Sequence, residues 1–268
     1  MSTLTKQSVK PKYTARLLKA GALLEDMRIL VRNWENSSNT RNQATLIVLE
    51  NLLGKPSRSR ALDIFKCAFS PRFINGKPPQ AWKIVHSLEE RNVPINILRP
   101  VYYWITARNE PLLYDFVCEE LAKINQTSRQ FVTTEEVAIW IKNKLSSHKI
   151  TWSESVTLGV ARKILSILRD FGILQGAVKK KIAPMYLPVE AFAYIAFALT
   201  NEGFSGTKLI NHPDWQLFLF TPGTIEHMFL EADRHKLLSY FAAGQIVRIE
   251  FPANSYEEMA NVIAQRTA

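Results

Sequence analysis

Apolar side chains recur at intervals of three and four residues through most of the chain, and this period places them on one face of an α-helix. The first segment with this pattern runs from about residue 14 to residue 34, and two others cover residues 97–109 and 111–124. Short connections that contain proline or glycine separate the segments. Because about six such helices fit into roughly the first 125 residues, the sequence predicts a helical bundle there.

Capping boxes mark two of the helix starts. In a capping box, a Thr and a Glu or Gln three residues later each accept a hydrogen bond from the other's backbone amide. Thr40 and Gln43 form one such pair, and Thr133 and Glu136 form the other. Between these two starts, Pro71 is expected to break the chain because its ring fits poorly inside a helix.

A different order of elements is predicted beyond residue 130. The capping box at Thr133 begins a first helix, Ser153 can cap a short second one, and a third ends at Gly172. Residues 173–174 and 182–187 follow as two short strands joined by a turn. Three helices followed by a hairpin is the order of a winged helix, whose third helix enters the major groove of DNA.

The polar stretch 125–130 is the expected boundary between a domain of residues 1–128 and a second domain of residues 129–268. Near the end of the chain, residues 239–243 and 246–251 predict another hairpin. The expected fold class is therefore mostly α, with an N-terminal helical bundle, a winged-helix-like element and small β-hairpins in the C-terminal half.

Positive charge is unevenly distributed along the chain. The whole sequence has a formal net charge of +10. Residues 1–60 contain 11 basic and 4 acidic side chains, and residues 128–187 contain 10 and 4. Residues 61–127 are close to neutral, and residues 188–268 are acidic, with 5 basic and 9 acidic side chains. Two separate basic segments point to a polyanionic partner, although solvated helix faces would have the same composition.

The candidate nucleic-acid-binding residues are the cations at predicted helix ends, on the third helix of the winged element and in its hairpin. The front of that helix carries Ser153, Ser155 and Thr157 and no Arg, Asn or Gln that could read bases, so we expect contacts to phosphates with little sequence preference. Winged helices also bind proteins, and that alternative stays open. The candidate residues are Lys55, Arg58, Arg60, Arg162, Lys163, Arg169, Lys179, Lys180 and Lys181.

Motifs for catalysis are missing or incomplete. Gly54 and Lys55 suggest a phosphate-binding loop, but Leu49 stands where that loop needs glycine and Pro56 where it needs Ser or Thr. No Gly-x-Ser-x-Gly elbow occurs. The sequence therefore predicts no catalytic residues and no cofactor, and we expect the protein not to be an enzyme.

Histidine and cysteine patterns predict no metal centre. His227, Glu231 and His235 recur along one predicted helix and span too great a length to converge on one ion. Cys67 and Cys118 are too few for a disulfide framework and are expected to be reduced, partly buried thiols.

Membrane insertion and secretion are not expected from the sequence. The longest apolar run, residues 191–199, is too short for a bilayer, which needs about 20 residues. The first ten residues are polar and lack the apolar segment of a secretion signal. A cytoplasmic protein without a membrane partner is the expectation.

Three blocks of sequence resemble the BrxA family, small accessory proteins of the BREX bacteriophage-exclusion systems. The first is residues 13–28, YTARLLKAGALLEDMR, and the second is residues 50–53, ENLL, followed by SRSR at residues 57–60. The third is residues 237–250, LLSYFAAGQIVRIE. The resemblance thus extends over nearly the full chain.

That resemblance implies a mostly helical, non-enzymatic component of a phage-resistance system that distinguishes self from foreign DNA by methylation. Members of the family are similar in fold to NusB, a helical RNA-binding antitermination protein, and are associated with double-stranded DNA. The family has no active site, so the candidate residues above depend on charge and position alone. Double-stranded DNA is the expected partner, together with other BREX components. The alternative is a protein-interaction scaffold or RNA binder in the same defence complex.

Overall fold

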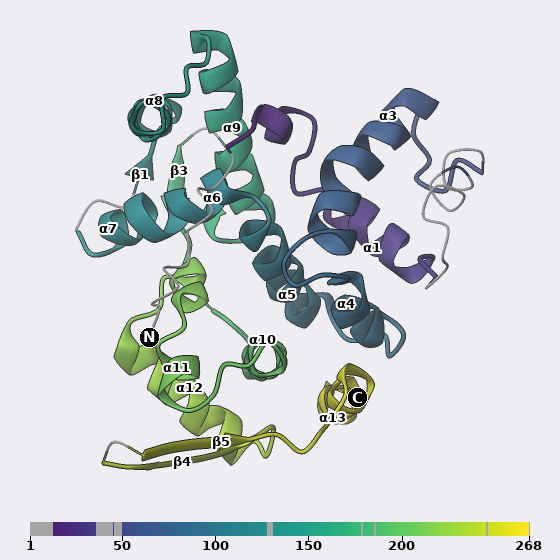
Figure 1. Ribbon diagram of the computed structural model, residues 1–268, viewed down its shortest axis with the longest axis vertical. Helices are drawn as coiled ribbons and strands as arrows, with labels where there is room; N and C mark the ends of the chain where they lie inside the picture. The colour runs from purple at the N-terminus through teal and green to yellow at the C-terminus, as the bar shows by residue number, and fades with distance from the viewer. Residues whose placement is uncertain are drawn as a thin grey trace, which may run out of the picture.

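The computed structural model describes residues 13–35, 45, 50–127, 131–177, 179–184, 186–244 and 246–267, and the structural statements below concern these residues. Most of them are helical, and the strands form two small antiparallel sheets (Figure 1). The prediction of a mostly α protein with small hairpins in its C-terminal half is confirmed. The predicted box at Thr40 and Gln43 lies outside the described residues.

The first half of the chain contains short and long helices in succession. They are η1 (Ala15–Leu18), α1 (Leu24–Arg32), α3 (Arg58–Ile64), η2 (Phe65–Ile74), α4 (Trp82–Glu89), α5 (Ile95–Arg108), α6 (Pro111–Asp115), η3 (Phe116–Leu121) and α7 (Ala122–Asn125).

The second half combines helices with the strands of both sheets. Its elements are β1 (Phe131–Val132), α8 (Thr134–Ser147), α9 (Glu154–Asp170), β2 (Leu174–Gln175), β3 (Lys180–Ile182), α10 (Val189–Asn201), α11 (Thr207–Ile210), η4 (Pro213–Phe218), α12 (Pro222–Arg234), β4 (Ser239–Ala243), β5 (Ile246–Glu250) and α13 (Tyr256–Thr267).

Helix α5 is the centre of the packing. It contacts α4, α6, η2, η4 and α10, which come from both halves of the chain. Its consecutive aromatic residues Tyr102, Tyr103 and Trp104 are all fully buried. Residues 101–107 of α5 are all buried, so this part of the helix is covered on every side, whereas Asn96 near its start is exposed.

Contacts between the two halves continue at both ends of the chain. The C-terminal helix α13 packs on α4 and α10, away from the hairpin β4–β5 that precedes it (Figure 1). Helix η1 packs on α9. The predicted boundary between residues 128 and 129 lies outside the described residues, although the start of the polar stretch 125–130 is described, and the division into two domains stays a prediction.

The predicted helix over residues 14–34 is wrong, because the chain forms η1 and α1 with a break between them. In the break, the carbonyl oxygens of Ala20 and Gly21 accept hydrogen bonds of 2.9 Å from Arg72, and Leu23 has a left-handed backbone with φ of 52°. These carbonyls are therefore used by a side chain from η2 instead of by amides one helical turn further along.

The two helices predicted between Ser153 and Gly172 are one helix, α9, so this prediction is also wrong. Ser153 does cap its start, accepting from the Val156 amide, and Gly172 ends it with φ of 84°. No helix-breaking residue stands between them except Gly159, which a helix tolerates at a cost of about 1 kcal/mol.

Strand β3 ends earlier than the predicted strand 182–187, because Pro184 follows it and proline has no amide to donate to a sheet. Pro71 does not break the chain as predicted, since it lies inside η2, a π-helical stretch. The capping box of Thr133 and Glu136 and the hairpin β4–β5 are confirmed.

A buried ion pair joins three segments of the N-terminal half. Arg72 has a fully buried side chain and donates to Glu110 over 2.8 Å, besides its bonds to the carbonyls of residues 20 and 21. Arg16 of η1 donates to the other carboxylate oxygen of Glu110 over 3.0 Å. Burial lowers the pKa of Arg72, and the charge and hydrogen bond of Glu110 oppose that shift.

We predict that Arg72→Met strongly destabilises the protein, because it leaves the buried carboxylate of Glu110 with fewer partners. Breaking a buried pair by removing one member costs about 3–5 kcal/mol, which urea unfolding followed by circular dichroism can measure. Arg234→Met is the control, since Arg234 pairs with Glu231 at the surface with 71% of its side chain exposed. Equal unfolding midpoints for the two variants would contradict the prediction.

Candidate nucleic-acid interface

The region predicted as a winged element contains a three-stranded antiparallel sheet beside two packed helices. The sheet order is β1-β3-β2, so the strand before α8 pairs with the last strand of the hairpin. Phe131 is opposite Lys181, and Leu174 is opposite Ile182. Helices α8 and α9 pack on each other, and β2 follows directly on the end of α9.

Helix α9 has one buried face and one face open to solvent. Val160, Ile164 and Leu168 are fully buried. Arg162 and Lys163 lie on the exposed side, and neither forms a hydrogen bond or ion pair with any residue that the structure describes. Their charges are thus available to a ligand.

Arg169, on the last turn of α9, is exposed but already paired. Its guanidinium group donates to Asp170 over 2.7 Å and to Ser166 over 3.3 Å. The neighbouring carboxylate cancels much of its charge, so Arg169 is a weaker phosphate ligand than Arg162.

The three lysines of the hairpin have different environments. Lys179 is exposed and has no partner among the described side chains. Lys180 donates to the carbonyl of Ala177 over 2.8 Å and so helps to close the turn. Lys181 lines a hollow beneath the sheet.

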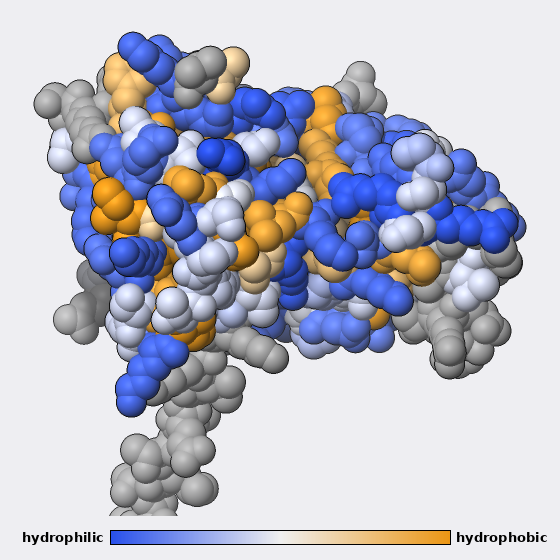
Figure 2. Space-filling view, turned by 90° about the horizontal axis from the view of Figure 1, so that it is seen from above, coloured by the Kyte–Doolittle hydropathy of each residue, from blue (hydrophilic) through white to orange (hydrophobic). Residues whose placement is uncertain are grey.

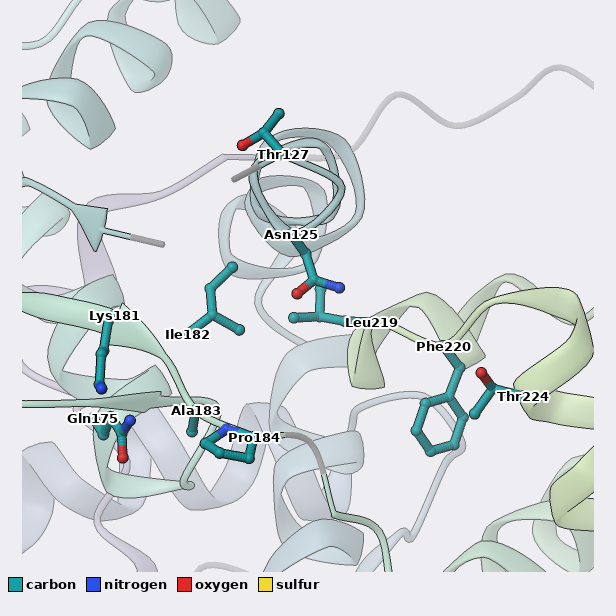
Figure 3. A pocket seen from close by; sticks show the side chains of 10 residues that line it. All are labelled: Asn125, Thr127, Gln175, Lys181, Ile182, Ala183, Pro184, Leu219, Phe220 and Thr224. Carbon is teal, nitrogen blue, oxygen red and sulfur yellow. The ribbon is translucent and has the colours of Figure 1, made fainter. Parts of the chain in front are cut away.

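This hollow has a volume of about 460 Å³ (Figure 3). It lies between the end of α7, the outgoing strand β3 and the segment that leads into α12, and Figure 3 shows Asn125, Ile182 and Leu219 around its middle. Gln175 and Lys181 border it on the side of the sheet, and Phe220 on the side of α12.

The candidate residues near α3 are only partly free. Lys55 pairs with the buried carboxylate of Asp26 over 2.7 Å, so its charge is used inside the protein. Arg60 donates to the backbone carbonyl of Lys19 over 2.9 Å. Arg58, at the first position of α3, is exposed and has no partner among the described residues.

Helix η1 connects the two basic segments. Figure 1 shows η1 between α3 and α9 at the same end of the molecule. Arg60 bonds to Lys19 at the end of η1, and the preceding Leu18 lies against α9, where a Cβ atom at Gly159 would stand 2.8 Å from its Cδ2 atom. Arg162 is one turn further along α9 from Gly159.

Lys19 is therefore a surface cation that the sequence did not assign to the interface. Its side chain is 60% exposed and contacts Asp63 over 3.1 Å. In the sequence, Lys19 falls outside the apolar stripe of residues 14–34, and this position alone indicated that its side chain is on the surface. Figure 2 shows this end of the molecule from above, where hydrophilic surface is interrupted by apolar patches.

The other titratable groups considered from the sequence lie elsewhere. His227 and His235 each approach Glu231 at 3.9 Å on the exposed side of α12. The described residues contain no group of three or more His, Cys, Asp or Glu side chains that could hold a metal ion. Cys67 and Cys118 are free thiols, and burial raises the pKa of Cys118 to about 12.

Among the helices of the described residues, none is both long enough and apolar enough to cross a membrane.

Comparison with known proteins identifies one family. The family described as BrxA matches residues 11–198 of the chain. Among the curated proteins there is no match. The crystal structure of an uncharacterized protein from Magnetospirillum magneticum is similar in fold, with a TM-score of 0.58 and 15% sequence identity over 78% of this chain and 98% of the other.

We predict that Gly159→Leu separates η1 from α9, because the added side chain occupies the space of Leu18. Hydrogen exchange of the amides of Lys19 and Ala20, which donate to the Arg16 carbonyl of η1, should accelerate while the rest of the core stays protected. Gly223→Leu is the control, since a Cβ atom at Gly223 meets nothing within 4 Å. Unchanged exchange of the Lys19 and Ala20 amides would show that the contact with α9 does not hold η1.

Proposed function

Because the chain belongs to the BrxA family of accessory proteins in BREX phage-exclusion systems, we propose that it binds double-stranded DNA in that defence system without catalysing a reaction. The observation that carries the proposal is the set of unpaired cations on two helices that have η1 between them (Figure 1). Arg58 on α3 and Arg162 and Lys163 on α9 have no protein partner among the described residues. Lys19, directly after η1, is exposed and paired with Asp63.

The order of elements supports the use of α9 and the hairpin. A strand, two helices and a hairpin whose last strand pairs with the first strand match the arrangement of a winged helix, and α7 supplies a helix ahead of them. In such a module the second of the packed helices meets the major groove and the hairpin meets the backbone. Lys179, in the turn of the hairpin, would then contact a phosphate.

Phosphates rather than bases are the expected contacts of α9. Its first residues are occupied within the protein, since Ser153 accepts from the Val156 amide and Thr157 donates to the Ser153 carbonyl over 3.0 Å. Ser155 is within 3.1 Å of the Ser153 hydroxyl. Without Arg, Asn or Gln in this turn, α9 cannot discriminate bases strongly.

The proposal extends to partners and location. The family relation supports other BREX components as protein partners and a cytoplasmic site of action on DNA. The NusB-like fold implied by the family leaves RNA as an alternative polyanion for the same cations. Competition between RNA and duplex DNA for the protein separates the two.

A second candidate function is contact with a protein partner through the hairpin β4–β5. Phe241 is 60% exposed and Ile246 is 69% exposed, and both stand near the turn of the hairpin. Ile246 is opposite Ala243, two residues after Phe241, so both side chains lie on one face of the hairpin, and adjoining exposed apolar side chains can mark an interaction surface. This surface would serve a scaffold role alongside DNA binding.

We predict that Arg162→Ala combined with Lys163→Ala weakens binding to a blunt DNA duplex equally for different sequences. Fluorescence anisotropy across salt concentrations should show the slope of log affinity against log salt falling by about 1 for each phosphate contact removed. Replacing Lys179, Lys180 and Lys181 with Glu should weaken binding as well, through repulsion of the backbone.

Arg169→Ala is the matched control, because it removes a cation that Asp170 already pairs. It should change affinity much less than the double variant does. Absence of duplex binding at low salt would refute the proposal, and equal effects of the control and the double variant would remove α9 from the interface.

A further inference from the structure

Arg99 is an unsatisfied cation in the first turns of α5. Its Nε atom is buried and has no hydrogen-bond partner. Among the residues that the structure describes, no carboxylate pairs with its guanidinium group and no carbonyl accepts from it. The other deeply placed arginines differ, since Arg72 and Arg108 are each bonded to carboxylates. A buried donor without a partner costs free energy, and no described carboxylate neutralises the charge of this guanidinium group.

The guanidinium group borders a pocket of about 230 Å³. The walls are mostly apolar and come from α5, the end of α9 and the segment after β3. Tyr186 stands at its edge with 80% of its surface exposed, which makes it the most exposed of the large hydrophobic side chains described. The pocket thus combines one free cation, an aromatic ring open to solvent and an apolar floor.

The position of the pocket favours a nucleic-acid ligand over an acidic peptide. Pro184 borders both this pocket and the larger hollow of Figure 3, so the two share part of the chain leaving β3. Lys181 lines that neighbouring hollow, which places a second cation on the far side of the shared residue. A duplex cannot enter a space of this size, whereas a single base can.

We propose that this pocket binds one unstacked nucleotide of a single-stranded DNA segment. The phosphate accepts hydrogen bonds from the guanidinium group of Arg99, and the base stacks on the ring of Tyr186. Arginine and an exposed aromatic ring are the pair of groups that single-strand sites use, because every base has a face for stacking. This site is separate from the cations of α3 and α9 and goes beyond the proposed duplex binding.

The test measures binding of fluorescein-labelled oligo(dT) to the full-length protein carrying Arg162→Ala and Lys163→Ala, which removes the competing cations of α9. Arg99→Gln and Tyr186→Ala should each weaken binding about tenfold. Tyr186→Phe keeps the ring and should bind as the parent does. Phe241→Ala, another exposed aromatic on the distant hairpin, is the control and should have no effect.

Two further readouts separate the outcomes. Arg99→Gln should not lower the melting temperature, because the Arg99 side chain forms no bond within the described protein and its buried Nε has no acceptor to lose. A large drop would make it a structural residue and overturn the proposal. Oligo(dT) binding that ignores both variants also overturns it, as does Arg99-dependent binding of poly-glutamate in place of oligo(dT). In the otherwise unaltered chain, Arg99→Gln should bind a DNA duplex as tightly as the unaltered protein does. The proposal for the pocket and the proposal that the α9 cations bind a duplex can therefore fail separately.

Discussion

The buried pair of Arg72 and Glu110 determines how the N-terminal segment is folded. Each of the three nitrogens of this fully buried guanidinium group donates a hydrogen bond, one to a carboxylate at the start of α6 and two to backbone carbonyls between η1 and α1. In the break, these two carbonyls accept from Arg72, and the amide of Met27 donates to the carbonyl of Leu23 at the start of the next helix. The chain breaks after η1, which leaves this short helix between α3 and α9. The proposed DNA surface depends on that placement, because η1 brings Lys19 to the space between the two basic helices.

Two other buried carboxylates tie distant elements to the central helices in the same way. Glu89 of α4 accepts from Arg28 over 2.7 Å and from the Tyr102 hydroxyl over 3.1 Å. Asp214 of η4 accepts from Trp104 over 2.7 Å and from Arg108 over 3.0 Å. These hydrogen bonds need a particular geometry of donor and acceptor, so they determine which elements pack on α5. Apolar burial has no such requirement and supplies most of the stabilisation.

Local signals in the sequence predicted those features that depend on neighbouring residues. The capping box at Thr133, the stop at Gly172 and the last hairpin each arise from a few adjacent side chains, and all three occur in the structure. The break after η1 was missed, and the side chain that binds its carbonyls, Arg72, lies about fifty residues away in sequence. Charge counts also could not show which candidate cations are free, since Asp26, far from Lys55 in sequence, already pairs with it.

The central claim is that cations of α3, η1 and α9 form one surface for a DNA duplex. Hydrogen exchange of the full-length protein with and without a blunt duplex tests this most directly. One saturating duplex should slow exchange together in residues 15–19, 58–64 and 154–170, with little change in α13. Protection confined to α9, or to none of these segments, would contradict the account.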